Sequence, residues 1–180
     1  MKFRKGHILD ELLIFKIQGD DMKAFSLLYQ RWQPKLLKHA YRMTRDDEGA
    51  LDVVQEAWQA ISRGIKNLRK PEAFSTWAYR IVNNKSANWI KEQQKQREVR
   101  KEHVLEQYEE EGNDNLEIIR KALGLMPAKD KAALSLFYLE GHSVKEIAKI
   151  FSISEGTVKS RLFYARKLLK EKVENYKKQL

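Results

Sequence analysis

The clearest alternation of apolar and polar positions lies in residues 141–169, which predict a helix, a tight turn and a second helix. Ser143 precedes an apolar-periodic run and Glu146 follows three residues later, so the two residues can satisfy each other's free backbone donors in a capping box. The segment 151–153 is too short for anything but a turn. Ser154 is a favourable N-cap for the second helix.

The second helix of this pair has two distinct faces. Its apolar positions follow spacings of four, three and four residues, one stripe on a helix with 3.6 residues per turn: Val158, Leu162, Ala165 and Leu169. The opposite side carries small and basic residues: Gly156, Lys159, Ser160, Arg166 and Lys167. Small residues permit close approach and cations reach phosphates and guanine edges, so this face suits the major groove of DNA. Two helices of a bundle with a merely solvated basic side are the structural alternative.

Residues 127–170 resemble region 4 of the bacterial sigma factors of the extracytoplasmic-function (ECF) group. The specific part is the run I-S-E-G-T-V-K-S-R-L-x-x-A-R, which begins at Ile153. The resemblance implies that this helix reads the −35 promoter element as duplex DNA, with nine residues at the interface: Ser154, Glu155, Gly156, Thr157, Lys159, Ser160, Arg161, Arg166 and Lys167. A helix-turn-helix alone also fits response regulators and repressors, so the rest of the chain has to decide between these classes.

The first half of the chain also predicts helices. Residues 24–41 have apolar side chains near helical spacing, and Pro34 is expected to bend or break that helix. After a polar turn at 42–47, residues 48–62 predict a helix with one apolar stripe: Val54, Ala57, Trp58 and Ile61. Its opposite face carries carboxylates and amides: Asp52, Gln55, Glu56 and Gln59. In an otherwise basic block this face fits a basic partner helix, although an ordinary solvated helix side has the same composition.

The run L-D-V-V-Q-E-A-W at residues 51–58 is similar to region 2.2 of the same family. In the family, the D-L-V-Q-E-T-F run docks on the clamp helices of the largest polymerase subunit. Asp52, Gln55 and Glu56 match that run, and Trp58 stands where Phe is usual. The resemblance therefore implies that core RNA polymerase is the partner of this face.

Residues 63–70 predict a loop, and Pro71 is well placed to begin a helix that extends to about residue 97. The first half of that helix has an apolar face: Phe74, Trp77, Ala78, Ile81 and Val82. The second half is expected to project amides and cations beside Trp89: Asn83, Asn84, Asn88, Lys91 and Lys95. Amides, aromatic rings and cations together suit single-stranded bases, which need stacking surfaces and hydrogen bonds to base edges.

The run F-S-T-W-A-Y-R-I-V-N-N at residues 74–84 resembles regions 2.3 and 2.4, where the family's helix and its preceding loop open and read the −10 element. The resemblance implies seven −10 contacts: Lys66, Asn67, Arg69, Asn83, Asn84, Asn88 and Lys91. Asn83 replaces the frequent Arg of the family and Asn88 replaces the frequent Asp. Both departures bear on which −10 bases this chain accepts.

Charge divides the chain into three parts within a net charge of +10. Residues 1–97 carry 19 Lys and Arg against 11 Asp and Glu, residues 98–117 carry 2 against 8, and residues 118–180 carry 14 against 6. Two basic blocks around an acidic segment suggest two nucleic-acid-facing domains joined by a linker. We expect an all-α protein of two helical domains: residues 1–97 as sigma region 2, 98–115 as an acidic flexible linker, and 116–180 as sigma region 4.

Composition argues against several other classes. The chain has no cysteine and its four histidines lack ligand spacing, so we expect neither a metal nor a cofactor. The one dense carboxylate cluster spans residues 46–56, and the helix dipole explains the carboxylates at its start, so an enzyme acting on nucleic acid is not expected. Neither a signal peptide nor a membrane-spanning pattern is recognised, which predicts a cytoplasmic protein.

These features predict a sigma factor that binds core RNA polymerase, reads the −35 duplex and melts the −10 element in promoter-specific initiation. A stand-alone helix-turn-helix repressor or activator is the alternative, but it leaves the helices at 48–62 and 71–97 without a purpose. Many members of the family are held by a membrane-bound anti-sigma factor. Because the chain ends at Leu180 without a long extension, we expect control by a separate protein of that kind.

Overall fold

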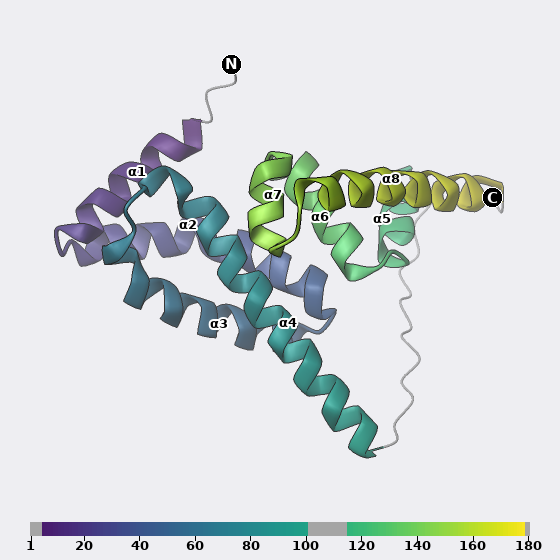
Figure 1. Cartoon of the computed structure of the whole chain (residues 1–180), viewed down its shortest axis with the longest axis horizontal. Helices are drawn as coiled ribbons and strands as arrows, with labels where there is room; N and C mark the ends of the chain where they lie inside the picture. Colours follow the sequence, from purple (N-terminus) through teal and green to yellow (C-terminus); the bar gives the residue numbers. More distant parts are fainter. Residues whose placement is uncertain (1–4, 101–114, 179–180) are drawn as a thin grey trace. The chain divides into compact units, whose positions relative to one another are not determined.

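The computed structural model describes residues 5–100 and 115–178, and within those residues it contains helices and no strand. The predicted all-α class is confirmed. The chain divides into two compact units, and the main boundary between them falls after Ile90, within the helix at residues 74–100, which begins in the first unit. In Figure 1 the first unit is coloured from purple to teal and the second from green to yellow.

The first unit contains four α-helices and two short 3₁₀ helices: α1 (Lys5–Gln18), α2 (Met22–Thr44), α3 (Asp47–Gly64), η1 (Ile65–Asn67), η2 (Pro71–Ala73) and α4 (Phe74–Arg100). Helix α2 packs on α1 and on α3, and α1 also packs on η1 and η2. Acidic caps set the helix starts, because the Asp21 carboxylate accepts from the Lys23 and Ala24 amides and Asp46 accepts from the Gly49 amide.

The core of the first unit follows the apolar stripe of α2. Its buried members recur every four residues: Leu28, Trp32, Leu36 and Ala40. The Trp32 ring lies 5.2 Å from the Phe74 ring and 5.9 Å from the Tyr79 ring, both on α4 and both nearly perpendicular to it. Edge-to-face aromatic contacts of this kind hold the start of α4 against α2.

The structure differs in detail from three local predictions. Of the bend or break expected at Pro34, the break does not occur: α2 continues through this exposed residue, which lies between the core anchors Trp32 and Leu36. The polar turn predicted at residues 42–47 is only two residues long, because Arg45 takes a left-handed conformation and its N–H bonds the Tyr41 carbonyl at 2.8 Å. A 3₁₀ turn precedes α4, and α4 continues to residue 100, three residues into the predicted linker.

The second unit contains α5 (Asn115–Gly124), α6 (Ala128–Tyr138), α7 (Val144–Phe151) and α8 (Glu155–Lys178). Helix α8 packs on α5 and α6. The predicted stripe of α8 faces this core: Val158, Leu162 and Ala165 are buried, and Leu169 is half-buried. Most of the predicted linker, residues 101–114, lies outside the described residues.

Across residues 5–100 and 115–178, none of the helices combines the length and apolar character needed to cross a membrane.

Candidate nucleic-acid and protein interfaces

The turn between α7 and α8 is built by two serines. Ser152 adopts a left-handed conformation and donates its N–H to the Ala148 carbonyl, which ends α7. The Ser154 hydroxyl accepts from the Thr157 amide at 3.0 Å and lies 2.8 Å from the Thr157 hydroxyl. The predicted turn and N-cap are both present, so a helix-turn-helix is formed.

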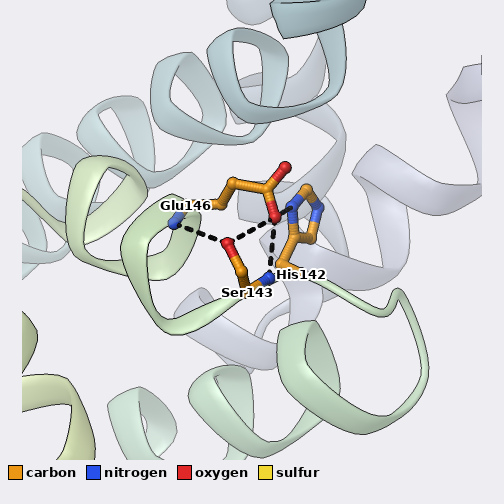
Figure 2. Close-up of polar contacts among 3 residues, drawn as sticks. All are labelled: His142, Ser143 and Glu146. Carbon is orange, nitrogen blue, oxygen red and sulfur yellow. Dashed lines mark hydrogen bonds and ion pairs between the residues drawn. The ribbon is translucent and has the colours of Figure 1, made fainter. Parts of the chain in front are cut away.

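The start of α7 carries the predicted capping box, shown in Figure 2. The Ser143 hydroxyl accepts from the Glu146 amide at 3.2 Å, and the Glu146 carboxylate accepts from the Ser143 amide at 2.7 Å. The same carboxylate oxygen lies 3.8 Å from Nδ1 of His142. The amide and the hydroxyl of Ser143 and the His142 ring therefore all lie against Glu146. These contacts hold the start of α7 in place.

Eight of the nine predicted −35 residues are exposed at or near the start of α8 or along its outer face. Arg161 is the exception. It is half-buried, and its Nε lies 3.7 Å from an Asp130 carboxylate oxygen on α6, so it is placed where it can hold α8 to α6. Arg161 follows Val158 by three residues and precedes Ala165 by four, so its place beside the buried stripe could have been found from the helical period.

Gly156 lies in the first turn of α8 with open space around it. A Cβ at this position would meet only the Ser154 hydroxyl at 3.7 Å, an ordinary contact. The fold therefore does not require glycine here. The small residue leaves the exposed start of the helix open to a close neighbour, as expected of a face that enters a DNA groove.

Two exposed aromatic side chains were missed in the sequence. Phe163 is 57% exposed and Tyr164 is 65% exposed, on the outer side of the same helix. Nearby, Nη1 of Arg166 donates to the Tyr138 hydroxyl at 3.2 Å. The outer face of α8 is thus less uniformly small than the pattern of Gly156 and Ser160 predicts.

Helix α3 separates its two faces as predicted. Asp52, Gln55, Glu56 and Gln59 are all exposed. The opposite stripe is buried, and the indole of Trp58 donates to Gln33 Oε1 at 2.6 Å and packs against the Tyr29 ring at 4.9 Å. The α3 face, meaning these four polar residues, is therefore held rigidly by a packed core beneath it.

Two further residues border the α3 face. Leu51 is 54% exposed, and it precedes Gln55 by four residues, so it lies on the same side of the helix. Nζ of Lys85, on α4, donates to Glu56 Oε2 at 2.7 Å. The helical period of α3 could have revealed Leu51, whereas nothing in the sequence pairs Glu56 with a residue 29 positions away.

The residues predicted for the −10 strand fall in two groups. Lys66, Asn67 and Arg69 are exposed around η1, where Lys66 donates to the Asp20 carboxylate. This loop is held in place because Gln18 Nε2 donates to the Leu68 carbonyl at 2.9 Å. Asn84, Asn88 and Lys91 are exposed on α4: together with the loop group they make up what we call the strand face.

Asn83 is the exception in this set, and its predicted projection into solvent is wrong. Its side chain is 8% exposed, and its Oδ1 finds no hydrogen-bond partner among the described residues. It follows Tyr79 by four residues and is adjacent to Val82, so it lies on the buried side of α4. Trp89 is also turned inward, because a Cβ on Gly49 would lie 2.2 Å from its ring.

No group of three or more His, Cys, Asp or Glu side chains suited to a metal ion occurs among the described residues. The four residues of the α3 face are acidic or amide, whereas the strand face carries only amides and cations.

Comparison with known proteins identifies the family. The model of Sigma-70 region 2 matches residues 28–96, and that of Sigma-70 region 4 matches residues 116–169. The ECF RNA polymerase sigma-E factor of Haemophilus influenzae is 33% identical over 186 residues, covering 93% of this chain and 96% of the relative. The chain belongs to the ECF sigma factors. This ECF sigma factor functions in promoter-specific initiation of transcription, as predicted from the sequence.

Other relatives are similar in extent. The ECF RNA polymerase sigma-E factor of Escherichia coli is 31% identical, with 93% of this chain and 95% of the relative covered. The RNA polymerase sigma-H factor of Pseudomonas aeruginosa is also 31% identical, with 89% and 91% covered. Because these matches include region 2 as well as the helix-turn-helix, a stand-alone helix-turn-helix regulator is not favoured.

Two solved structures share the fold of this ECF sigma factor. One is the sigma factor RpoE of Bartonella quintana in complex with the anti-sigma factor NepR, with a TM-score of 0.65, 24% identity, and 85% of this chain and 98% of that chain covered. The other is CnrH in complex with the cytosolic domain of CnrY, with a TM-score of 0.65, 22% identity, and 93% and 98% covered.

Proposed function

We propose that this ECF sigma factor divides the work of initiation between its two units. Residues 1–97 act as sigma region 2, which holds core RNA polymerase and the −10 strand, and residues 116–180 act as sigma region 4, which reads the −35 duplex. Residues 98–115 link them. The family matches at 28–96 and 116–169 and the two basic blocks of the chain support this division.

The observation that carries the proposal is the α3 face. Asp52, Gln55, Glu56 and Gln59 project from a helix whose other side is locked into the core by Trp58. A rigid row of carboxylates and amides beside an exposed leucine offers a basic helix both ion pairs and an apolar anchor. This row is the core polymerase docking surface in our proposal.

The strand face then receives the non-template strand of the −10 element. Its exposed members are Lys66, Asn67, Arg69, Asn84, Asn88 and Lys91. Amides bond base edges and cations follow the backbone, so captured bases offset the few kcal/mol that unstacking costs per step. Asn83 acts on this face only indirectly, through the packing of α4, because its side chain is buried.

The outer face of α8 reads the −35 duplex. The exposed residues Gly156, Lys159 and Ser160 lie in its first turns, where recognition helices contact base edges. Ser154 and Thr157 hold the start of the helix through their hydroxyls, and Glu155 stands beside them. Arg166 and Lys167 lie further along, placed for the DNA backbone, while Arg161 positions α8 through Asp130.

Regulation in this proposal is by an anti-sigma factor, the kind of partner with which RpoE of Bartonella quintana was solved. The protein works in the cytoplasm, where its polymerase and promoters lie. It carries out no covalent chemistry itself, since strand opening is driven by the free energy of binding the separated bases.

Reconstitution with purified core RNA polymerase tests the function. The chain and the core enzyme should elute as one complex in size-exclusion chromatography, and that complex should start transcripts at a defined promoter class mapped by primer extension. The matched control is core enzyme alone, which should start at none of those sites. Separate elution, together with DNA binding by the chain alone, would instead support an independent regulator.

A further inference from the structure

An ion pair connects the α3 face with a lysine of α4 that borders the strand face. Nζ of Lys85 donates to Oε2 of Glu56 at 2.7 Å, with the lysine side chain 36% exposed and the glutamate 58% exposed. Glu56 belongs to the α3 face, proposed to dock on polymerase. Lys85 belongs to α4, between Asn84 and Asn88 of the strand face.

The pair must change when a basic partner reaches the α3 face. A cation of the partner that approaches Glu56 meets the ammonium of Lys85 on the same carboxylate, and two like charges at one site repel each other. Both residues of the pair are substantially exposed, so the bond between them is weak and can be exchanged. In the free protein Lys85 is therefore a competitor for the docking residue Glu56.

A released Lys85 would lie beside the residues proposed to bind the −10 strand. Neighbouring helix positions differ by about 100° in direction, so Lys85 stands about 100° from Asn84 and about 60° from Asn88 around α4. This puts it at the rim of the strand face. Its long flexible stem lets the ammonium swing from the carboxylate toward a phosphate without any backbone movement.

We propose that Lys85 is an exchangeable cation of this sigma factor. In the free protein it pairs with Glu56 and competes with core polymerase; in the holoenzyme it leaves Glu56 and contacts the backbone of the −10 strand. Polymerase docking thereby adds one positive charge to the strand face. The inference rests on the proposed docking role of the α3 face.

Lys85→Met, which keeps most of the length of the side chain and removes its charge, separates the two roles. We expect it to tighten the binding of the free protein to purified core polymerase by about 2- to 5-fold at low salt, the range that exposed ion pairs provide. The gain should vanish at high salt, because screening removes the competition. The resulting holoenzyme should bind a single-stranded −10 oligonucleotide more weakly, with a salt slope smaller by about 0.7.

Lys91→Met is the matched control. Lys91 is an exposed cation of the same helix and carries no bond to the α3 face, so its loss should reduce the strand salt slope while core affinity stays unchanged. Lys85→Arg should keep both wild-type properties, because a guanidinium can make either bond.

The outcomes are separable. If Lys85→Met leaves core affinity unchanged or weakens it, or leaves the strand salt slope unchanged, the exchange is overturned. Glu56→Gln in the same binding assay distinguishes the two levels of the proposal. A loss of core affinity in Glu56→Gln alongside a neutral Lys85→Met overturns only the exchange, whereas a neutral Glu56→Gln removes Glu56 from the docking surface and overturns the exchange with it.

Discussion

The indole of Trp89 rests directly on the backbone of Gly49. A Cβ built at Gly49 would lie 2.2 Å from Cζ2 of Trp89, closer than any real carbon contact. The first turn of α3 and the second half of α4 are therefore fixed against each other through a position that tolerates no side chain. Because α3 carries the proposed docking residues and α4 carries three of the proposed strand residues, this contact fixes the two helices relative to each other.

Gly49→Ala should destabilise region 2. The added methyl group forces Trp89 out of place, and overpacking of this kind costs about 1 to 3 kcal/mol. Chemical denaturation followed by tryptophan fluorescence would measure the loss. Gly124→Ala on α5 is the control, since a Cβ there meets nothing within 4 Å; followed by circular dichroism, because no tryptophan lies in that part of the chain, it should be neutral or slightly stabilising. Equal stability of the Gly49 variant and the wild type would show that Trp89 is not held on this backbone.

Gly156→Ala should separate stability from DNA binding. The position has room for a methyl group within the fold and lies in a helix, where alanine is favoured over glycine by about 0.5 to 1 kcal/mol. The variant should therefore melt at or above the wild-type temperature. Its holoenzyme should bind the −35 duplex more weakly if DNA approaches this turn closely. Wild-type affinity in filter binding would place the groove contact elsewhere on α8.

Lys159→Ala tests the electrostatic part of the same face. Loss of one phosphate contact should lower holoenzyme affinity for duplex promoter DNA and reduce the salt slope by about 0.9. Lys129→Ala, which removes an exposed cation of α6 outside the proposed interface, should leave the slope intact. An unaltered slope for the Lys159 variant across the salt series would remove this residue from the interface.

Asn84→Ala should impair promoter opening, whereas Asn83→Ala should lower the stability of the fold. Asn84 is exposed, so its loss should reduce open complexes, seen as lower permanganate reactivity of −10 thymines, while closed complexes survive. Asn83 is buried, so its replacement should act first on the stability of α4 packing. If Asn84→Ala weakens closed and open complexes equally, the residue does not act in melting.

The sequence predicts an exposed surface well only where the two sides of a helix differ clearly in polarity. In α3 the acidic side and the apolar stripe alternate at helical spacing, so Asp52 and Glu56 were placed correctly on the exposed side. In α4 the run from Asn83 to Asn88 is amide-rich on several sides, so composition could not show that Asn83 faces inward and Asn84 outward. Only the period relative to Tyr79 separates them.

Contacts between side chains on different helices could not be predicted from the sequence. The capping box of Ser143 and Glu146 is local and was predicted, because its geometry depends on a three-residue spacing. The pairing of Lys85 with Glu56 depends on how α4 crosses α3, which a helical pattern within either segment does not contain.

The most direct test of the account is core polymerase binding by the double variant Asp52→Lys with Glu56→Lys. Both side chains are exposed above an intact core, so circular dichroism and melting temperature should change little. Reversing charges that face a basic partner can cost about 2 to 5 kcal/mol each. The matched control is Glu171→Lys with Glu174→Lys on α8, which makes the same change in net charge outside the α3 face. We predict that the α3 variant stays folded and loses core binding while the control keeps it; a folded α3 variant that binds core polymerase at wild-type strength would contradict the docking surface.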